Sequence, residues 1–323
     1  MISPAKITVG IDLGGTHVRV ALVDADGTVL LRERRRTPHD DPEPTILVEM
    51  ARSMLDRSRV QFGDREVSGV VVGVPGLIDY YEEQLLGAPN LPASWTSALS
   101  ESWLSERIGA PIALANDADL AAVGEANFGA GRGLSDVVFV TISTGIGAGT
   151  VLNGRLVHGR YSACEVGHIV IDRIAAANGR PKTVEDLGSG TALARRAAEA
   201  GLAADGAELA AMAARGWSAP PISGAAGEWS GVEPDVVAAH VWREALGDAS
   251  LGIVNLCWLM APQLVVVGGG VGMNAELVLP IIRQSLAAHG PHFLDIDVTS
   301  AVLGDDAGLA GAAAWWKAVG RHE

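Results

Sequence analysis

Two segments of this 323-residue chain follow the same order of short apolar runs and glycine turns. Residues 7–31 predict three strands, joined first by a Gly-Gly turn and then by an Asp-Gly turn. Residues 137–157 predict three more strands, joined by a Thr-Gly-Ile-Gly turn and an Asn-Gly turn. The repeated plan predicts two similar α/β domains that face each other, each contributing one glycine turn to a shared cleft.

The rest of the chain alternates between predicted strands and helices. Helical spacing and N-cap residues predict helices at 45–59, 99–108, 117–124, 190–200, 233–260, 274–288 and 307–319, the last after the N-cap candidates Asp305 and Asp306. Short apolar runs predict strands at 67–74, 111–115 and 264–267, and residues 213–233 read as a loose segment. We expect a smaller domain of residues 1–116 plus 308–323, and a larger one of residues 117–307.

Composition excludes several classes of protein. Hydrophobic residues make up 48% of the chain and charged residues 19%, which excludes intrinsic disorder. Cys164 and Cys257 are the only cysteines, which excludes a disulfide scaffold and a four-cysteine zinc site and suits a reducing cytoplasm. The net charge of −14 argues against a nucleic-acid partner. We expect neither a signal peptide nor a membrane span.

The balance of glycine and lysine indicates how a phosphate would be bound. The chain has 40 glycines, about 12% against a usual ~7%, and its lysines are only Lys6, Lys182 and Lys317. Backbone N–H groups and a metal ion would therefore hold most of a phosphate-bearing ligand.

The turn from Asp12 to Thr16 is the first candidate site. Its glycines allow the backbone to approach a phosphate, Thr16 can hydrogen-bond it, and Asp12 can hold Mg²⁺ directly or through water. The alternative is a hairpin that needs glycine for its geometry alone.

The turn over 143–149 is the second candidate, and neither a P-loop nor a Rossmann fingerprint fits it. The glycines at 268–270 leave room for an adenine ring, or serve close helix–sheet packing.

Two groups of polar residues complete the candidates. Asn116-Asp117 follows a strand, where a carboxylate can accept a proton from an attacking hydroxyl, or can cap the next helix equally well. Glu165 and His168, with Glu185 further on, can bind several hydroxyls at once, although a lone histidine is more often structural.

Seven motifs, taken in order, resemble those of the ROK-family sugar kinases, which belong to the actin/hexokinase superfamily. They are Asp12-Leu13-Gly14-Gly15-Thr16, Val74-Pro75-Gly76, Asn90-Leu91-Pro92, Asn116-Asp117, Thr144-Gly145-Ile146-Gly147, Glu165-Val166-Gly167-His168 and Gly268-Gly269-Gly270. The resemblance covers essentially the whole chain. It implies a two-domain, ribonuclease H-like α/β fold with a ligand cleft between the domains, and a glucokinase-like, ATP- and Mg²⁺-dependent kinase that forms a homodimer.

The resemblance also implies a role for each matching residue. Asp117 would be the general base for the attacking hydroxyl. The sugar would contact Gly76, Asn90, Asn116, Asp117, Glu165, His168 and Glu185. The nucleotide would contact Asp12, Gly14, Gly15, Thr16, Thr144, Gly145, Gly269 and Gly270, and Asp12 would serve Mg²⁺.

The chain departs from the family at one motif. ROK kinases usually carry three zinc-binding cysteines after the Glu-x-Gly-His box, and Ala176, Asn178 and Thr183 stand in their places here. Without thiolates we expect no zinc, and His168 would contact the sugar alone or be structural. This departure leaves the sugar specificity open.

Three functions are compatible with a fold of this kind. A sugar kinase is favoured. A DNA-binding regulator of the same fold is disfavoured because the first strand starts near Lys6 and the net charge is negative. A silent sugar-binding protein is disfavoured by Asp117 and both glycine turns. The acceptor stays open among glucose, mannose, allose, fructose and N-acetylated sugars, and polyphosphate stays open as the donor.

Overall fold

The computed structural model of the chain describes residues 6–63, 65–172, 182–222, 229 and 231–320. The chain forms two compact units and two five-stranded sheets, which confirms the predicted two-domain α/β class. The first unit takes in Met1–Val137, Gly149–Ala163 and Val302–Glu323, and the second Val138–Ala148 and Cys164–Ala301. The domain boundaries expected after residues 116 and 307 stay a prediction.

The first sheet consists of a three-stranded meander followed by two parallel strands. Its order is β3 (Val29–Arg36), β2 (His17–Asp24), β1 (Ile7–Leu13), β4 (Val67–Val74) and β7 (Ile112–Asn116). β1 pairs antiparallel with β2 and parallel with β4, which in turn pairs parallel with β7. The carboxyl ends of β1, β4 and β7 therefore lie at one edge of the sheet, and that edge carries Asp12 and Asn116.

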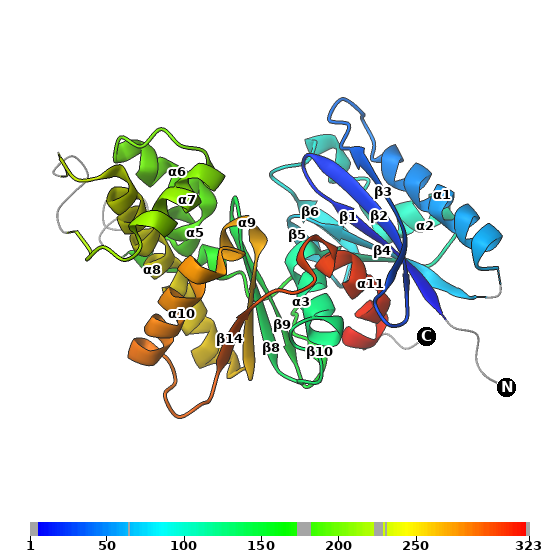
Figure 1. Cartoon of the computed structure of the whole chain (residues 1–323). Coiled ribbons are helices and arrows are strands. Elements are labelled where there is room, and N and C mark those ends of the chain that lie inside the picture. The colour runs from blue at the N-terminus through cyan, green and yellow to red at the C-terminus, as the bar shows by residue number, and fades with distance from the viewer. Residues whose placement is uncertain (1–5, 64, 173–181, 223–228, 230, 321–323) are drawn as a thin grey trace. The chain divides into compact units, whose positions relative to one another are not determined.

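In the part of the first unit that the structure describes, the α-helices are α1 (Thr45–Gln61), α2 (Glu101–Ile108), α3 (Asp117–Phe128) and α11 (Ala307–Ala318). α11 packs against α3 and β1, as Figure 1 shows. The two helices approach so closely that a Cβ on Gly311 would lie 2.0 Å from the carbonyl oxygen of Leu120. The last helix starts as predicted, but Asp306 makes no capping hydrogen bond, and its carboxylate instead accepts one from Arg32 at 3.0 Å.

The second sheet repeats the order of the first. It runs β10 (Arg155–Leu156), β9 (Ile146–Leu152), β8 (Val137–Ile142), β13 (Leu264–Gly268) and β14 (Asp297–Ser300). β10 pairs antiparallel with β9, and β13 pairs parallel with β14. The internal repeat that the sequence predicts is therefore present at the level of strand order.

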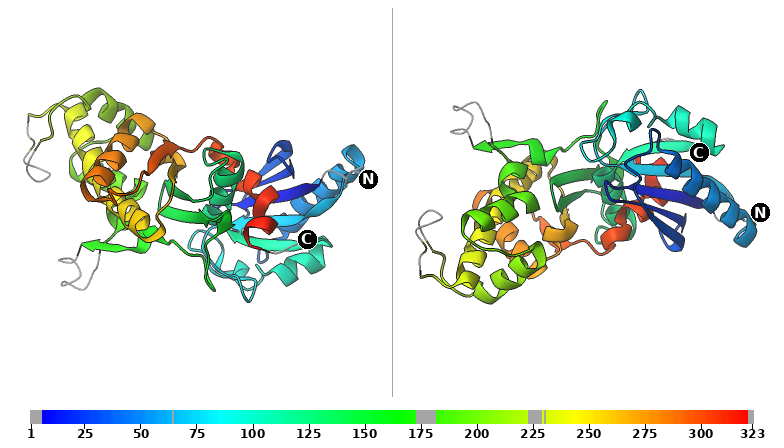
Figure 2. Two further views of the ribbon diagram at one scale, coloured as in Figure 1. Left: turned by 90° about the horizontal axis from the view of Figure 1, so that it is seen from below. Right: turned by 90° about the horizontal axis from the view of Figure 1, so that it is seen from above.

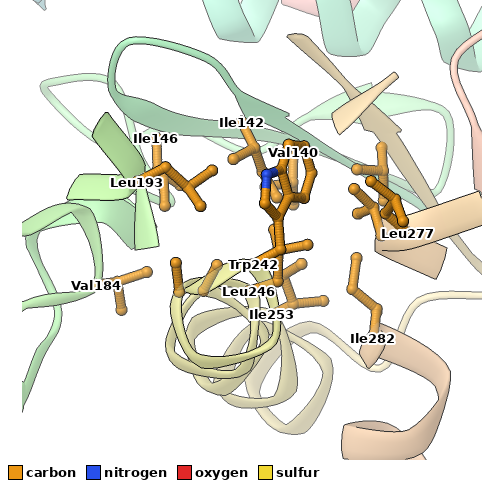
Figure 3. Packing of buried hydrophobic residues seen from close by; sticks show 14 of the residues in the cluster. Val140, Ile142, Ile146, Val184, Leu193, Trp242, Leu246, Ile253, Leu277 and Ile282 are labelled. Atoms are coloured by element: carbon orange, nitrogen blue, oxygen red, sulfur yellow. The ribbon is translucent and has the colours of Figure 1, made fainter. Parts of the chain in front are cut away.

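The second unit is built around one long helix. Among its described residues, the helices are α5 (Val184–Gly188), α6 (Gly190–Glu199), α7 (Gly206–Gly216), α8 (Pro234–Met260), α9 (Gly269–Gly272) and α10 (Ala275–His289). α8, drawn in yellow, packs against both α7 and α10 (Figures 1 and 2). Trp242, Leu246 and Ile253 project from α8 toward Val140 and Ile142 of β8 and fill the core of this unit (Figure 3).

Several short elements escape prediction because they lack a clear period. They are β5 (Leu77–Asp79), β6 (Gln84–Gly87), β11 (Val170–Asp172), β12 (Lys182–Thr183) and the 3₁₀ turns η1 (Ala93–Trp95), η2 (Val166–His168) and η3 (Gly304–Asp306). The prediction of a loose segment over 213–233 is wrong at its start, where α7 ends at Gly216. Part of that segment, residues 223–228 and 230, lies outside the described residues. Within the described part of the chain, no helix combines the length and the apolar character needed to span a membrane.

Candidate functional site

The turn between β1 and β2 forms one wall of a cavity of about 290 Å³ in the first unit. Its lining contains the four residues of this turn that are predicted to contact the nucleotide, namely Asp12, Gly14, Gly15 and Thr16. The rest of the lining consists of His17, Arg19, Arg34 and Asp305. The turn is closed by a hydrogen bond from the Gly14 N–H to the His17 carbonyl at 2.9 Å. The polar lining and the exposed Thr16 hydroxyl suit an anionic ligand.

Asp12 has a partner that the motif does not reveal. Arg19 Nε donates to Asp12 Oδ2 at 2.8 Å, and Arg19 also pairs with Asp305 at 3.2 Å. Burial raises the pKa of Asp12 above its ordinary value, while the charge and hydrogen bond of Arg19 oppose that rise. The strand register places Asp12 opposite Arg19, so pairing the two predicted strands residue by residue could have revealed this contact from the sequence.

The Asn116-Asp117 pair lies where β7 ends and α3 begins. Asn116 is the N-cap, because its Oδ1 accepts from the N–H groups of Ala118 at 2.9 Å and Asp119 at 3.2 Å. The alternative in which Asp117 caps the helix is therefore wrong. Asp117 is exposed at the first helical position, between the buried Asn116 and Ala118, and its Oδ1 accepts from the Ala118 N–H at 2.9 Å.

Gly76 and Asn90 lie near these residues in the first unit. The Asn116 Nδ2 donates to the carbonyl oxygen of Gly76 at 3.0 Å, so Gly76 adjoins the end of β7. Asn90 is exposed and lies beside the first turn, since a Cβ on Gly15 would be 2.8 Å from its carbonyl oxygen. The structure thus groups the predicted residues of this unit around the glycine turn and the end of β7.

The second glycine turn joins β8 to β9 and is fixed from the side of α5 and α6. Thr191 Oγ1 donates to the Thr144 carbonyl at 2.8 Å. Glu185 Oε2 accepts from the Ile146 N–H at 2.8 Å. A Cβ on Gly145 would lie 2.4 Å from that same Glu185 oxygen, so only glycine fits there without displacing the carboxylate. Sequence reasoning missed Thr191, which no motif marks.

Glu165, His168 and Glu185 form the predicted hydroxyl-binding group of the second unit. η2 carries His168, and both Glu165 and His168 are exposed. Desolvation raises the pKa of the Glu165 carboxyl, with a further contribution from the charge of Glu185, while His168 acts in the opposite sense. Two carboxylates and an imidazole within mutual electrostatic reach can accept and donate hydrogen bonds to a polyol.

The segment that replaces the family's cysteines is only partly described. Ala176, Asn178 and Gly179 lie outside the described residues. Thr183, which stands in the third cysteine position, is the N-cap of α5: its side chain accepts from the Asp186 N–H at 3.2 Å, and its own N–H donates to Asp186 Oδ2 at 3.0 Å. Among the described residues, no cluster of three or more His, Cys, Asp or Glu side chains could hold a metal ion.

The glycines after β13 border a larger cavity in the second unit. Gly269 adopts a positive φ of 83°, and Gly270 lies on the wall of a cavity of about 680 Å³. The other residues of that wall come from α7 (Gly206, Ala207, Ala210, Ala211, Ala214) and from Met273, Asn274, Ala275, Glu276 and Leu277. The small side chains of α7 leave space for a flat apolar ring. The sequence prediction missed this contribution because α7 itself was not predicted.

The chain resembles known proteins over nearly its whole length. The model of the ROK family matches residues 8–319. A glucokinase from Streptomyces coelicolor is 32% identical over 315 residues, which cover 95% of this chain and 96% of that protein. The solved structure of a ROK hexokinase from Thermus thermophilus aligns with a TM-score of 0.75 at 28% identity, covering 95% of this chain and 96% of that one. A ROK family glucokinase from Streptomyces griseus, in complex with glucose and AMPPNP, aligns with a TM-score of 0.71 at 31% identity, covering 96% and 98%.

Proposed function

Because the chain belongs to the ROK family, we propose that it is a glucokinase-like sugar kinase that transfers the γ-phosphoryl group of ATP to a hexose hydroxyl. One observation carries the proposal. Asp117 is an exposed carboxylate at the end of a buried parallel strand, held between two buried residues at the start of α3. The carboxyl ends of parallel strands are where open α/β sheets bind their ligands.

Asp117 is proposed as the general base. The sugar hydroxyl oxygen attacks the γ-phosphorus, its proton passes to the Asp117 carboxylate, and the bond from the γ-phosphorus to the bridging oxygen of ADP breaks. Such a transfer depends on alignment and charge stabilisation more than on covalent catalysis.

The donor nucleotide is proposed to use the glycine turns and the α7 cavity. The backbone N–H groups of Gly15, Thr144 and Gly145 would face the phosphates, and the adenosine would lie at Gly269-Gly270 in the 680 Å³ cavity. Gly14 would line the same turn, which its own N–H closes onto the His17 carbonyl. The Asp12 carboxylate and Thr16 hydroxyl are oxygen donors of the kind that Mg²⁺ prefers. Magnesium, when bound with ATP, neutralises charge on the transferring group. The charge of Arg19 favours the ionised form of Asp12 in its mostly buried place.

The sugar is proposed to contact Glu165, His168 and Glu185 in the second unit, and Gly76, Asn90 and Asn116 in the first. The raised pKa of Glu165 makes this carboxyl easier to protonate than an ordinary glutamate, so it can act as donor or acceptor toward a hydroxyl. The Glu185 carboxylate is held in place by the Ile146 N–H before any sugar arrives. We also propose that the protein forms the homodimer implied by the resemblance.

Replacing Asp117 by Asn tests the proposed base. The amide keeps the size and the acceptor oxygen of the side chain but cannot take up a proton. We expect the sugar-dependent release of ADP to fall by about 10²-fold or more, while the sugar dissociation constant changes less than about threefold. Isothermal titration and a coupled ADP assay measure the two quantities.

The matched control is Asp56→Asn, which removes an exposed carboxylate of the same unit whose partner is Arg59. It should leave both quantities unchanged. Unchanged turnover in the Asp117→Asn protein would remove Asp117 as the base.

A further inference from the structure

Tyr80, just after β5, joins the end of β7 to the first turn of α3. Its Oη donates a hydrogen bond to Asp119 Oδ2 at 2.7 Å and accepts one from the Asn116 N–H at 3.2 Å. Asn116 is the residue directly before Asp117. One phenol oxygen therefore contacts the chain on both sides of the proposed base.

Asp119 closes this arrangement from the helix side. Its side chain is completely buried, and its N–H donates to the Asn116 Oδ1 that caps α3. Asn116, Asp119 and Tyr80 thus form a closed ring of hydrogen bonds that ties Asn116, the residue before Asp117, to the first turn of α3. A buried carboxylate is costly unless a donor satisfies it, so this ring has one strongly preferred geometry.

The phenol is itself held firmly. The Tyr80 N–H donates to the Arg160 carbonyl at 2.8 Å, and Arg160 binds the neighbouring Asp79 through its Nε at 2.8 Å. The Tyr80 ring packs edge-on against His158, with centroids 4.9 Å apart, and lies 6.2 Å from the ring of Trp315. Burial, and then the charge of Asp119, raise the pKa of Tyr80 well above its usual value, so the phenol keeps its proton and continues to donate.

We propose that Tyr80 and Asp119 are positioning residues, which fix Asn116 directly before Asp117 and so set the direction in which the Asp117 carboxylate leaves β7. The effect on catalysis rests on the proposed kinase function, whereas the role of Tyr80 and Asp119 in holding Asn116 does not. Neither residue needs to touch the sugar or the nucleotide. Their effect is on the alignment of the base, to which phosphoryl transfer is sensitive.

The test removes only the phenol oxygen. Tyr80→Phe leaves Asp119 buried without this donor and can impair folding, so the decisive comparison is Tyr80→Phe/Asp119→Asn against Asp119→Asn alone. The amide introduced by Asp119→Asn can still accept from Tyr80, so this single variant should keep kcat within about threefold of the natural protein. The double variant should lose about 10-fold or more in kcat, with the KM values for sugar and ATP changed less than about twofold. Tyr81→Phe removes an exposed hydroxyl from the adjacent residue and should change nothing.

A second readout does not depend on activity. The Asn116 N–H donates to Tyr80 Oη, so its hydrogen exchange should accelerate by about 10-fold or more in the double variant relative to Asp119→Asn. Equal kcat and equal exchange in the two proteins would overturn the inference, as would a loss confined to KM. If no sugar supports ADP release by the natural protein, the proposed function fails, and the exchange measurement alone decides whether Tyr80 fixes Asn116.

Discussion

At the scale of single residues, the chemistry of the candidate site depends on partners that a motif cannot display. Asp12 stands in a recognisable glycine motif, yet Arg19 influences its charge, because it donates to the carboxylate from the next strand. Asp117 could have been either a cap or a base from the sequence. The structure gives the capping role to Asn116, because its Oδ1 lies over two N–H groups at the helix start, and the role of Asp117 as base stays a proposal. The local sequence shows which residue types are present, while strand register and helix capping determine which contacts each residue makes.

The Asp12–Arg19 pair gives a prediction for stability against pH. Replacing Arg19 by Met leaves the Asp12 carboxylate, 21% exposed, without its cation, and the pKa of Asp12 in the folded protein rises further. The folded state then binds more protons than the unfolded state, so the free energy of unfolding falls as pH rises from the unfolded pKa near 3.8. We expect a loss of about 1–3 kcal/mol at about pH 7 and a smaller one at about pH 4.

Urea unfolding at the two pH values measures this difference. In the Arg19→Met background, Asp12→Asn removes the buried charge and should abolish the pH dependence of the loss. An equal loss at both pH values without that second change would show that Arg19 acts through packing and not through charge.

At the scale of elements, long periodic helices and buried strands could be predicted, and short or edge elements could not. The strand at 67–74 is found where the continuous valine run places it, because a buried parallel strand is apolar on both faces. β5, β6, β11 and β12 have at most four residues each, too few to establish a period. β3 runs to Arg36, beyond the predicted end at 31, because an edge strand tolerates exposed arginines that break the apolar pattern.

The contact between α3 and α11 gives a prediction at this scale. Gly311→Ala would place a methyl group 2.0 Å from the Leu120 carbonyl oxygen, so the helices must separate. We expect the free energy of unfolding to fall by roughly 1–3 kcal/mol and the Tm of the first unit to fall by several degrees. Gly308→Ala on the same helix meets no atom within 4 Å and should be neutral or stabilising by about 0.5–1 kcal/mol. Equal effects of the two substitutions would mean that helix propensity, and not the close approach, governs this contact.

At the scale of the whole molecule, the repeat of strand order was visible in the sequence as two matching sets of runs and turns. The family resemblance supplied the roles that spacing alone left open. What the sequence did not reveal is how the chain replaces the family's cysteines. Thr183 answers part of this question. Its side chain caps α5, the helix that begins with Val184 and Glu185.

The same replacement predicts the metal content of the purified protein. Cys257 is buried, which raises the pKa of its thiol to about 12 and makes it a poor zinc ligand. Cys164 is the only other cysteine in the sequence. We expect elemental analysis to find no stoichiometric zinc, and chelators to inhibit only until Mg²⁺ is restored. A tightly held zinc ion would show that another set of residues closes this loop.

ADP release from Mg²⁺-ATP in the presence of single sugars tests most directly whether this chain is the hexose kinase proposed above. The panel is glucose, mannose, allose, fructose and N-acetylated amino sugars, with polyphosphate as an alternative donor. We expect ADP and sugar phosphate in equal amounts, formed fastest with glucose or a close relative of glucose. Binding of a sugar without ADP release or sugar phosphate from any donor would contradict the proposal and identify a sugar-binding protein of the same fold.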